Sequence, residues 1–152
     1  MAVHGVSRAT RDLDLLVTAV ECLDPLSWAT LEREGLVVSI GRGDADDPLA
    51  GAVRLTTPGQ FPVDIIVGRA GWQRAALDRA AVQTIESVAV PVVTATDLVL
   101  LKLYAGGPPE AWDVEQLLAS GDRAVLVAEV AAALPALPDD ARQVWARIAE
   151  PR

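Results

Sequence analysis

The sequence predicts an α+β fold: a small mixed β-sheet flanked by helices, followed by a helical C-terminal part. Two observations support this prediction. Up to about residue 93, short aliphatic or alternating runs typical of strands are interspersed with helix-like segments. Beyond that point the chain has only helical start and stop signals. The 152 residues suit one domain, with a sheet-containing core at about 1–93 and a helical part at 94–152.

Four segments are expected to form buried or half-buried strands, at residues 13–18, 36–41, 51–56 and 62–67. The first and the last are aliphatic runs, and the third alternates apolar with polar residues. A further apolar run at 88–93 contains Pro91, which cannot donate a backbone hydrogen bond to a neighbouring strand. We therefore expect an edge strand or an extended connection there.

The helices are expected at residues 25–34, 69–81, 95–105 and 110–119, with two more alanine-rich helices after residue 122. Asp24 is a suitable cap, Pro25 suits the first helical position, and Gly35 ends that helix. Thr94 and Asp97 resemble a capping box, although Asp replaces the usual Glu or Gln. Gly106 and Gly107 end the helix at 95–105, and Pro108 and Pro109 start the next helix. Pro135 and Pro138 separate the last two helices.

The composition limits the kinds of site that the chain can build. Cys22 is the only cysteine, so it cannot form an internal disulfide, and a reduced thiol favours a cytoplasmic protein. His4 is the only histidine and receives no role, so a bound metal must take oxygen ligands, which favours magnesium or manganese. The net charge of −8 disfavours a broad nucleic-acid groove. No apolar run approaches the roughly 20 residues of a membrane span, and we expect no membrane partner.

Three aspartates are the candidate metal ligands. Asp12 and Asp14 stand two residues apart at the start of a predicted strand, so both carboxylates point to one face. Leu13, Leu15 and Val17 then point the other way, into the core. Asp64 lies within an aliphatic strand, where a buried carboxylate is costly unless it is paired or binds a metal. If the two strands are neighbours, three carboxylates converge in a geometry that suits two-metal phosphoryl-type transfer.

Two segments carry a resemblance to a known family. Residues 5–17, GVSRATRDLDLLV, resemble the acidic strand of the small nucleotidyltransferases related to the AbiEii abortive-infection toxins, in which Arg-x-Thr commonly precedes the acids. Residues 97–102, DLVLLK, are similar to the family's helix with an apolar stretch that ends in lysine, and Asp113 matches its following aspartate. The resemblance covers about residues 5–118.

The resemblance implies the polymerase-beta-like nucleotidyltransferase fold and transfer of a nucleotidyl group from a nucleoside triphosphate to a hydroxyl. Asp12 and Asp14 would bind Mg²⁺ or Mn²⁺, and Asp64 would bind a second ion or activate the acceptor. Asp113 would support Lys102 or the acceptor. The residues implied in nucleotide binding are Ser7, Arg8, Thr10 and Lys102. The implied partners are a transfer RNA end, a protein side chain or a small molecule as acceptor, and an antitoxin protein.

Each of these roles has a simpler alternative. Asp12 and Asp14 could be ordinary acids at a solvated strand end, and Asp64 could lie at an exposed strand edge. Lys102 could only extend its stem along an apolar helix, whereas as a phosphate ligand it should be removable with the fold nearly intact. Asp113 could be a first-turn acid that the helix dipole favours. For Arg11 we favour a structural or electrostatic role.

One departure from the family leaves a second function open. Its members normally carry a Gly-Gly or Gly-Ser pair upstream of the acidic strand, at a helix start where backbone amides hold phosphate. This sequence begins Met-Ala-Val-His-Gly, without that pair or its helix. Either the protein starts upstream of this methionine, or the chain is shortened. For the second case we expect a catalytically degenerate protein that keeps the fold and the acids and acts as a binding or partner module.

Overall fold

The computed structural model describes residues 1–6 and 12–149, and its elements confirm the predicted α+β class. The chain divides into two compact units. Residues 9–78 form what we call the sheet unit, and residues 1–8 with 79–152 form the helical unit. Among the described residues, no helix combines the length and the apolar character that crossing a bilayer requires.

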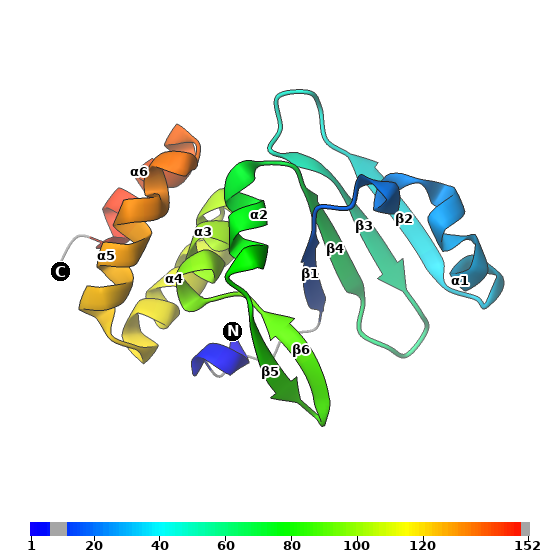
Figure 1. Cartoon of the computed structure of the whole chain (residues 1–152), viewed down its shortest axis with the longest axis horizontal. Coiled ribbons are helices and arrows are strands. Elements are labelled where there is room, and N and C mark those ends of the chain that lie inside the picture. The colour runs from blue at the N-terminus through cyan, green and yellow to red at the C-terminus, as the bar shows by residue number, and fades with distance from the viewer. Residues whose placement is uncertain (7–11, 150–152) are drawn as a thin grey trace. The chain divides into compact units, whose positions relative to one another are not determined.

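The sheet unit contains one four-stranded mixed sheet (Figure 1). Its strands are β1 (Leu13–Val17), β2 (Val37–Arg42), β3 (Leu49–Thr56) and β4 (Val63–Gly68). Their spatial order is β1-β4-β3-β2, in which β1 and β4 are parallel and the other pairs antiparallel. All four predicted strands are confirmed, with ends shifted by a few residues. The order places β4, the last of these four strands in the sequence, between β1 and β3.

One face of this sheet holds the apolar core of the unit. The buried members of the core are Leu23, Val53, Ile65 and Val67. Val17 packs against them, but the expectation that Leu13 and Leu15 also lie in the core is wrong, since they are 54% and 37% exposed. Both belong to β1, which lies at one end of the strand order, and the core reaches only the last residue of that strand.

Short helices complete the sheet unit: the 3-10 turns η2 (Val20–Leu23) and η3 (Pro25–Trp28), then α1 (Ala29–Arg33) and α2 (Gly71–Asp78). The predicted cap is confirmed, because the Leu26 amide donates to the Asp24 carboxylate at 3.0 Å. The first turn after this cap is 3-10 rather than α-helical. Trp28 joins the core and donates its indole hydrogen to the Cys22 carbonyl at 2.7 Å.

The helical unit is built around α3. Its elements are η1 (Ala2–His4), β5 (Ala81–Ile85), β6 (Val88–Val92), α3 (Ala95–Ala105), α4 (Pro108–Ser120), α5 (Arg123–Ala133), η4 (Leu134–Ala136) and α6 (Asp139–Ala149). Helix α3 contacts α4, α5 and α6 and buries Val99, Leu100 and Leu103 (Figure 1). It has little polar surface of its own, so three partner helices shield it from water.

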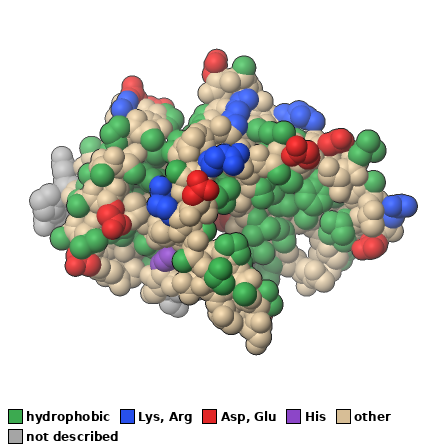
Figure 2. All heavy atoms as spheres, viewed as in Figure 1, with side chains coloured by type: hydrophobic (Ala, Val, Ile, Leu, Met, Phe, Trp, Pro, Cys, Tyr) green, Lys and Arg blue, Asp and Glu red, His purple; other side chains and the backbone are tan. Residues whose placement is uncertain are grey.

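The hairpin of β5 and β6 was predicted only in part. The apolar run at 88–93 forms strand β6, as one of the two expectations had it, whereas β5 was not predicted. Residue 81 was expected to end a helix, but α2 ends at Asp78 and Ala81 starts a strand. The two-residue turn consists of Glu86 and Ser87, both with positive φ, and lacks the Asn or Gly that usually marks such turns. Hydrophobic side chains gather on this hairpin (Figure 2), where Val82 is 70% exposed.

The start of α3 confirms the predicted capping interaction in a modified form. Thr94 Oγ1 accepts from the Asp97 amide at 3.1 Å and donates to the Asp97 carboxylate at 2.7 Å. Arg79 also donates to this carboxylate, through Nε at 3.1 Å and Nη2 at 2.5 Å. Because Asp97 is completely buried, these bonds replace the hydration that its charge loses.

Candidate functional site

The three candidate aspartates come together on the sheet unit. Asp14 in β1 is the direct neighbour of Asp64 in β4, and side chains at paired positions share a face of the sheet. Asp12 lies immediately before β1, two residues ahead of Asp14. One carboxylate oxygen from each of the three lies within 4.8 Å of the others. The predicted convergence of the three acids is therefore confirmed, and we call this group the acidic cluster.

Strand order decides between the two interpretations of Asp64. Strand β4 lies between β1 and β3, so Asp64 is not at an exposed strand edge. Its side chain is 18% exposed, whereas Asp12 and Asp14 are exposed. The cluster thus has one half-buried carboxylate at its base and two carboxylates that face solvent.

Arg54 is a member of this site that the sequence analysis did not identify. It lies in β3 directly opposite Asp64, and its Nη1 is 3.0 Å from Asp64 Oδ2 and 3.3 Å from Oδ1. The sequence contained part of the information needed to find Arg54, because the alternation in residues 51–56 puts Arg54 on the polar face of its strand. The missing information was that β3 and β4 are neighbours, and in which register.

The donor set of the acidic cluster suits a hard divalent cation. Carboxylate oxygens are the ligands that Mg²⁺ and Mn²⁺ prefer, and three of them here are close enough to share an ion. Three carboxylates at this separation also repel one another, which a cation would relieve. The cluster would hold the metal through Asp12, Asp14 and Asp64.

Lys102 and Asp113 form an ion pair inside the helical unit. Lys102 Nζ in α3 is 3.0 Å from Asp113 Oδ2 in α4. Asp113 is completely buried, and the Lys102 side chain is 20% exposed. Asp113 therefore contacts Lys102 directly, as the support implied by the resemblance requires.

This pair changes two expectations. Helix α4 begins at Pro108, so Asp113 is not a first-turn acid, and that alternative is wrong. The expectation that Lys102 can be removed with the fold nearly intact also needs revision. A lysine that only lay along the helix would be dispensable, whereas this one neutralises a carboxylate that has lost its water.

Four residues with predicted roles lie outside the described residues. They are the candidate nucleotide ligands Ser7, Arg8 and Thr10, and Arg11, for which a structural role was favoured. Their predicted roles stay predictions.

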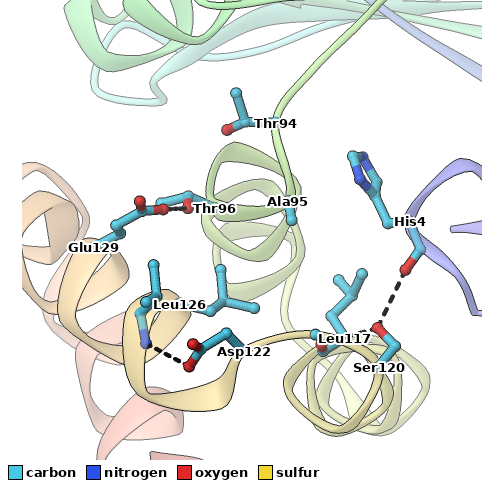
Figure 3. Close-up of a pocket in the computed structure, with 11 residues that line it drawn as sticks. His4, Thr94, Ala95, Thr96, Leu117, Ser120, Asp122, Leu126 and Glu129 are labelled. Atoms are coloured by element: carbon cyan, nitrogen blue, oxygen red, sulfur yellow. Dashed lines mark hydrogen bonds between the residues drawn. The ribbon is translucent and has the colours of Figure 1, made fainter.

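A pocket of about 270 Å³ lies in the helical unit, at the starts of α3 and α5 (Figure 3). His4 lies at its rim, with Nε2 3.0 Å from the Val93 carbonyl oxygen, and the Ser120 hydroxyl donates to the His4 carbonyl at 3.1 Å. Across the pocket, the Thr96 hydroxyl donates to the Glu129 carboxylate. Of the predicted site residues that the structure describes, none lines this pocket. His4 therefore has a structural role, since it connects η1 to the segment before α3.

Burial of the His4 ring predicts a pH dependence of stability. Burial, together with the positive amino terminus, lowers the pKa of His4 below its usual value of 6.5, and the hydrogen bond to Val93 opposes this only in part. The unfolded chain then binds more protons than the folded one in the window between the lowered pKa and 6.5. The contribution of His4 to stability is complete above pH 6.5 and is lost as the pH falls through the folded-state pKa.

The check is urea unfolding of the whole chain between pH 7.5 and pH 5, for the wild type and His4→Gln. We expect the wild type to lose more of its free energy of unfolding over this range than the variant does. Equal slopes for the two proteins would show that the His4 proton is not linked to folding.

No family model matches the chain, and no curated protein matches it. The geometry of the described residues is therefore the basis for assigning a function.

Proposed function

We propose that this chain is a metal-dependent nucleotidyltransferase that moves a nucleotidyl group from a nucleoside triphosphate to a hydroxyl. The observation that carries the proposal is the acidic cluster, in which two neighbouring strands bring three carboxylates within ligand distance of one another. Sites of this composition suit the two-metal form of phosphoryl-type transfer. The resemblance of residues 5–17 and 97–102 to AbiEii-type nucleotidyltransferases points the same way.

The chain's own residues have distinct parts in the proposed reaction. Asp12 and Asp14 would hold Mg²⁺ or Mn²⁺, which when bound supplies the positive charge that phosphate transfer needs. Asp64 would take part in metal binding or accept the proton of the attacking hydroxyl. The acceptor oxygen then bonds to the α-phosphorus, and the bond from that phosphorus to pyrophosphate breaks. Lys102, positioned by Asp113, would contact nucleotide phosphate.

The finer parts of the proposal follow from the resemblance. They are a tRNA end, a protein side chain or a small molecule as acceptor, and a role as the toxin of a toxin–antitoxin pair. A cytoplasmic location belongs with them and agrees with the free thiol of Cys22.

One observation favours a second candidate function. Arg54 already neutralises part of the acidic cluster, so the fold can hold the three acids together without a metal. A chain of this kind could retain the acids as a non-catalytic binding or partner module. Metal-dependent transfer distinguishes this candidate from the enzyme.

The test is incubation of the whole chain with each α-labelled nucleoside triphosphate and magnesium, with total RNA and total protein as acceptors. We expect label in one acceptor fraction with at least one nucleotide, and its loss when a chelator is added. Absence of label in every combination, with Mn²⁺ as well as Mg²⁺, would reject the enzyme and favour the binding module.

A further inference from the structure

Arg54, Asp64 and Asp14 form one row across three strands of the sheet unit. Arg54 in β3 is paired with Asp64 in β4, which is paired in turn with Asp14 in β1. Paired residues of neighbouring strands point to the same face, so the guanidinium lies at one end of the acidic cluster. Asp64 lies between a positive group and two further negative groups.

The guanidinium contacts both oxygens of Asp64 through a single nitrogen, Nη1, at 3.0 Å and 3.3 Å. A carboxylate has about four lone-pair directions, so Asp64 can accept from Arg54 and still offer an oxygen to a cation. The two positive groups would then share one carboxylate and repel each other across it. Arg54 is thus close enough to compete with a metal ion for Asp64.

We propose that Arg54 is a positioning residue that acts as a built-in counter-charge and weakens the binding of divalent cations to the acidic cluster of the free protein. The proposal rests on the metal-binding role given to the cluster above. Removal of Arg54 takes one positive charge away from Asp64 and so makes the acidic cluster more negative by one unit. A nucleoside triphosphate brings its own negative charge, so metal uptake is favoured when nucleotide is present.

A purely structural role for Arg54 makes a different prediction. Its side chain is 54% exposed, and exposed ion pairs contribute little to stability because water screens them. If Arg54 only supported the sheet, its removal would change stability slightly and leave the cation affinity unchanged. The affinity of the nucleotide-free protein for Mn²⁺ therefore separates the two roles.

The experiment is a titration of the full, nucleotide-free chain with Mn²⁺, in which the electron paramagnetic resonance signal reports free Mn²⁺. The proteins are the wild type, Arg54→Met, Arg54→Lys and Arg33→Met. Arg33 is a matched control, because it is exposed in the same unit and donates to Ala29 and Thr30 next to it in the chain. Its removal changes the net charge equally. Arg54→Gln replaces Arg54→Met if the methionine variant does not fold.

We expect Arg54→Met to bind Mn²⁺ about three- to tenfold more tightly than the wild type, as loss of one partly screened charge near the ion allows. Arg54→Lys and Arg33→Met should stay within about twofold of the wild type. Equal affinities in all four proteins would overturn the role of Arg54 and leave the proposed function standing. Absence of Mn²⁺ binding in all four would overturn both.

Discussion

Replacing Asp14 with asparagine is expected to remove both metal-dependent stabilisation and nucleotidyl transfer. Asp14 is the member of the acidic cluster that lies directly beside Asp64 in the parallel strand pair. Metal-ion catalysis contributes several kcal/mol to transition-state stabilisation, so transfer should fall by at least about a thousandfold. In the wild type, millimolar Mg²⁺ or Mn²⁺ should raise the melting temperature relative to chelator, because an ion that binds only the folded state stabilises it by mass action.

The matched control is Asp46→Asn. Asp46 is an exposed acid in the loop before β3, in the same sheet unit, and its replacement changes the net charge equally. Asp46→Asn should keep the metal-dependent rise in melting temperature and the transfer activity, and Asp14→Asn should lose both. A rise of equal size in the two variants would mean that the metal acts elsewhere. The acidic cluster would then lose its proposed role.

The sequence alone could predict the local geometry of the acids but not the contact between their strands. Asp12 and Asp14 share a face because strand side chains alternate, and this follows from spacing alone. Their contact with Asp64 depends on β4 lying beside β1, although β2 and β3 intervene in the sequence. Strand order is a tertiary property, so the sequence alone could make the contact only a condition of the prediction.

The two features that sequence reasoning missed share a physical cause. Arg54 joins the site through the register of β3 against β4, and β5 is a strand because β6 pairs with it. In both cases the decisive interaction is with a partner that local propensity does not reveal. The turn at Glu86 and Ser87 also lacks the usual residues for positive φ, so no local signal marked the hairpin.

Burial of Asp113 was not predicted, although the start of its helix at Pro108 was. A first-turn position for Asp113 does not agree with that start, because Asp113 lies five residues further on. The inward face of α4 carries Asp113 together with Val114 and Leu117. The energetic importance of Lys102 follows from this burial rather than from its own position on α3.

Lys102→Met is expected to destabilise the helical unit strongly. The variant keeps most of the apolar stem but removes the ammonium that lies 3.0 Å from the Asp113 carboxylate. Breaking a buried ion pair from one side costs about 3–5 kcal/mol, since the remaining charge stays in a poorly hydrated site. Lys102 is 20% exposed, so water can reach part of the site, and we expect a loss near the lower end of that range. Urea unfolding at neutral pH measures it.

The double variant Lys102→Met/Asp113→Asn separates stability from function. With both charges removed, most of the lost stability should return, because the buried carboxylate that Lys102 neutralised is then absent as well. The folded double variant then allows a nucleotide-binding measurement that the single variant does not. If Lys102 contacts phosphate, the double variant should have a free energy of unfolding close to that of the wild type. It should nevertheless bind nucleoside triphosphate much more weakly than the wild type does. Nucleotide affinity equal to that of the wild type would remove Lys102 from the nucleotide site.

The stability prediction for Lys102→Met has its own contrary outcome. A free energy of unfolding within about 0.5 kcal/mol of the wild type would show that the ion pair is solvated, since surface substitutions have effects of that size.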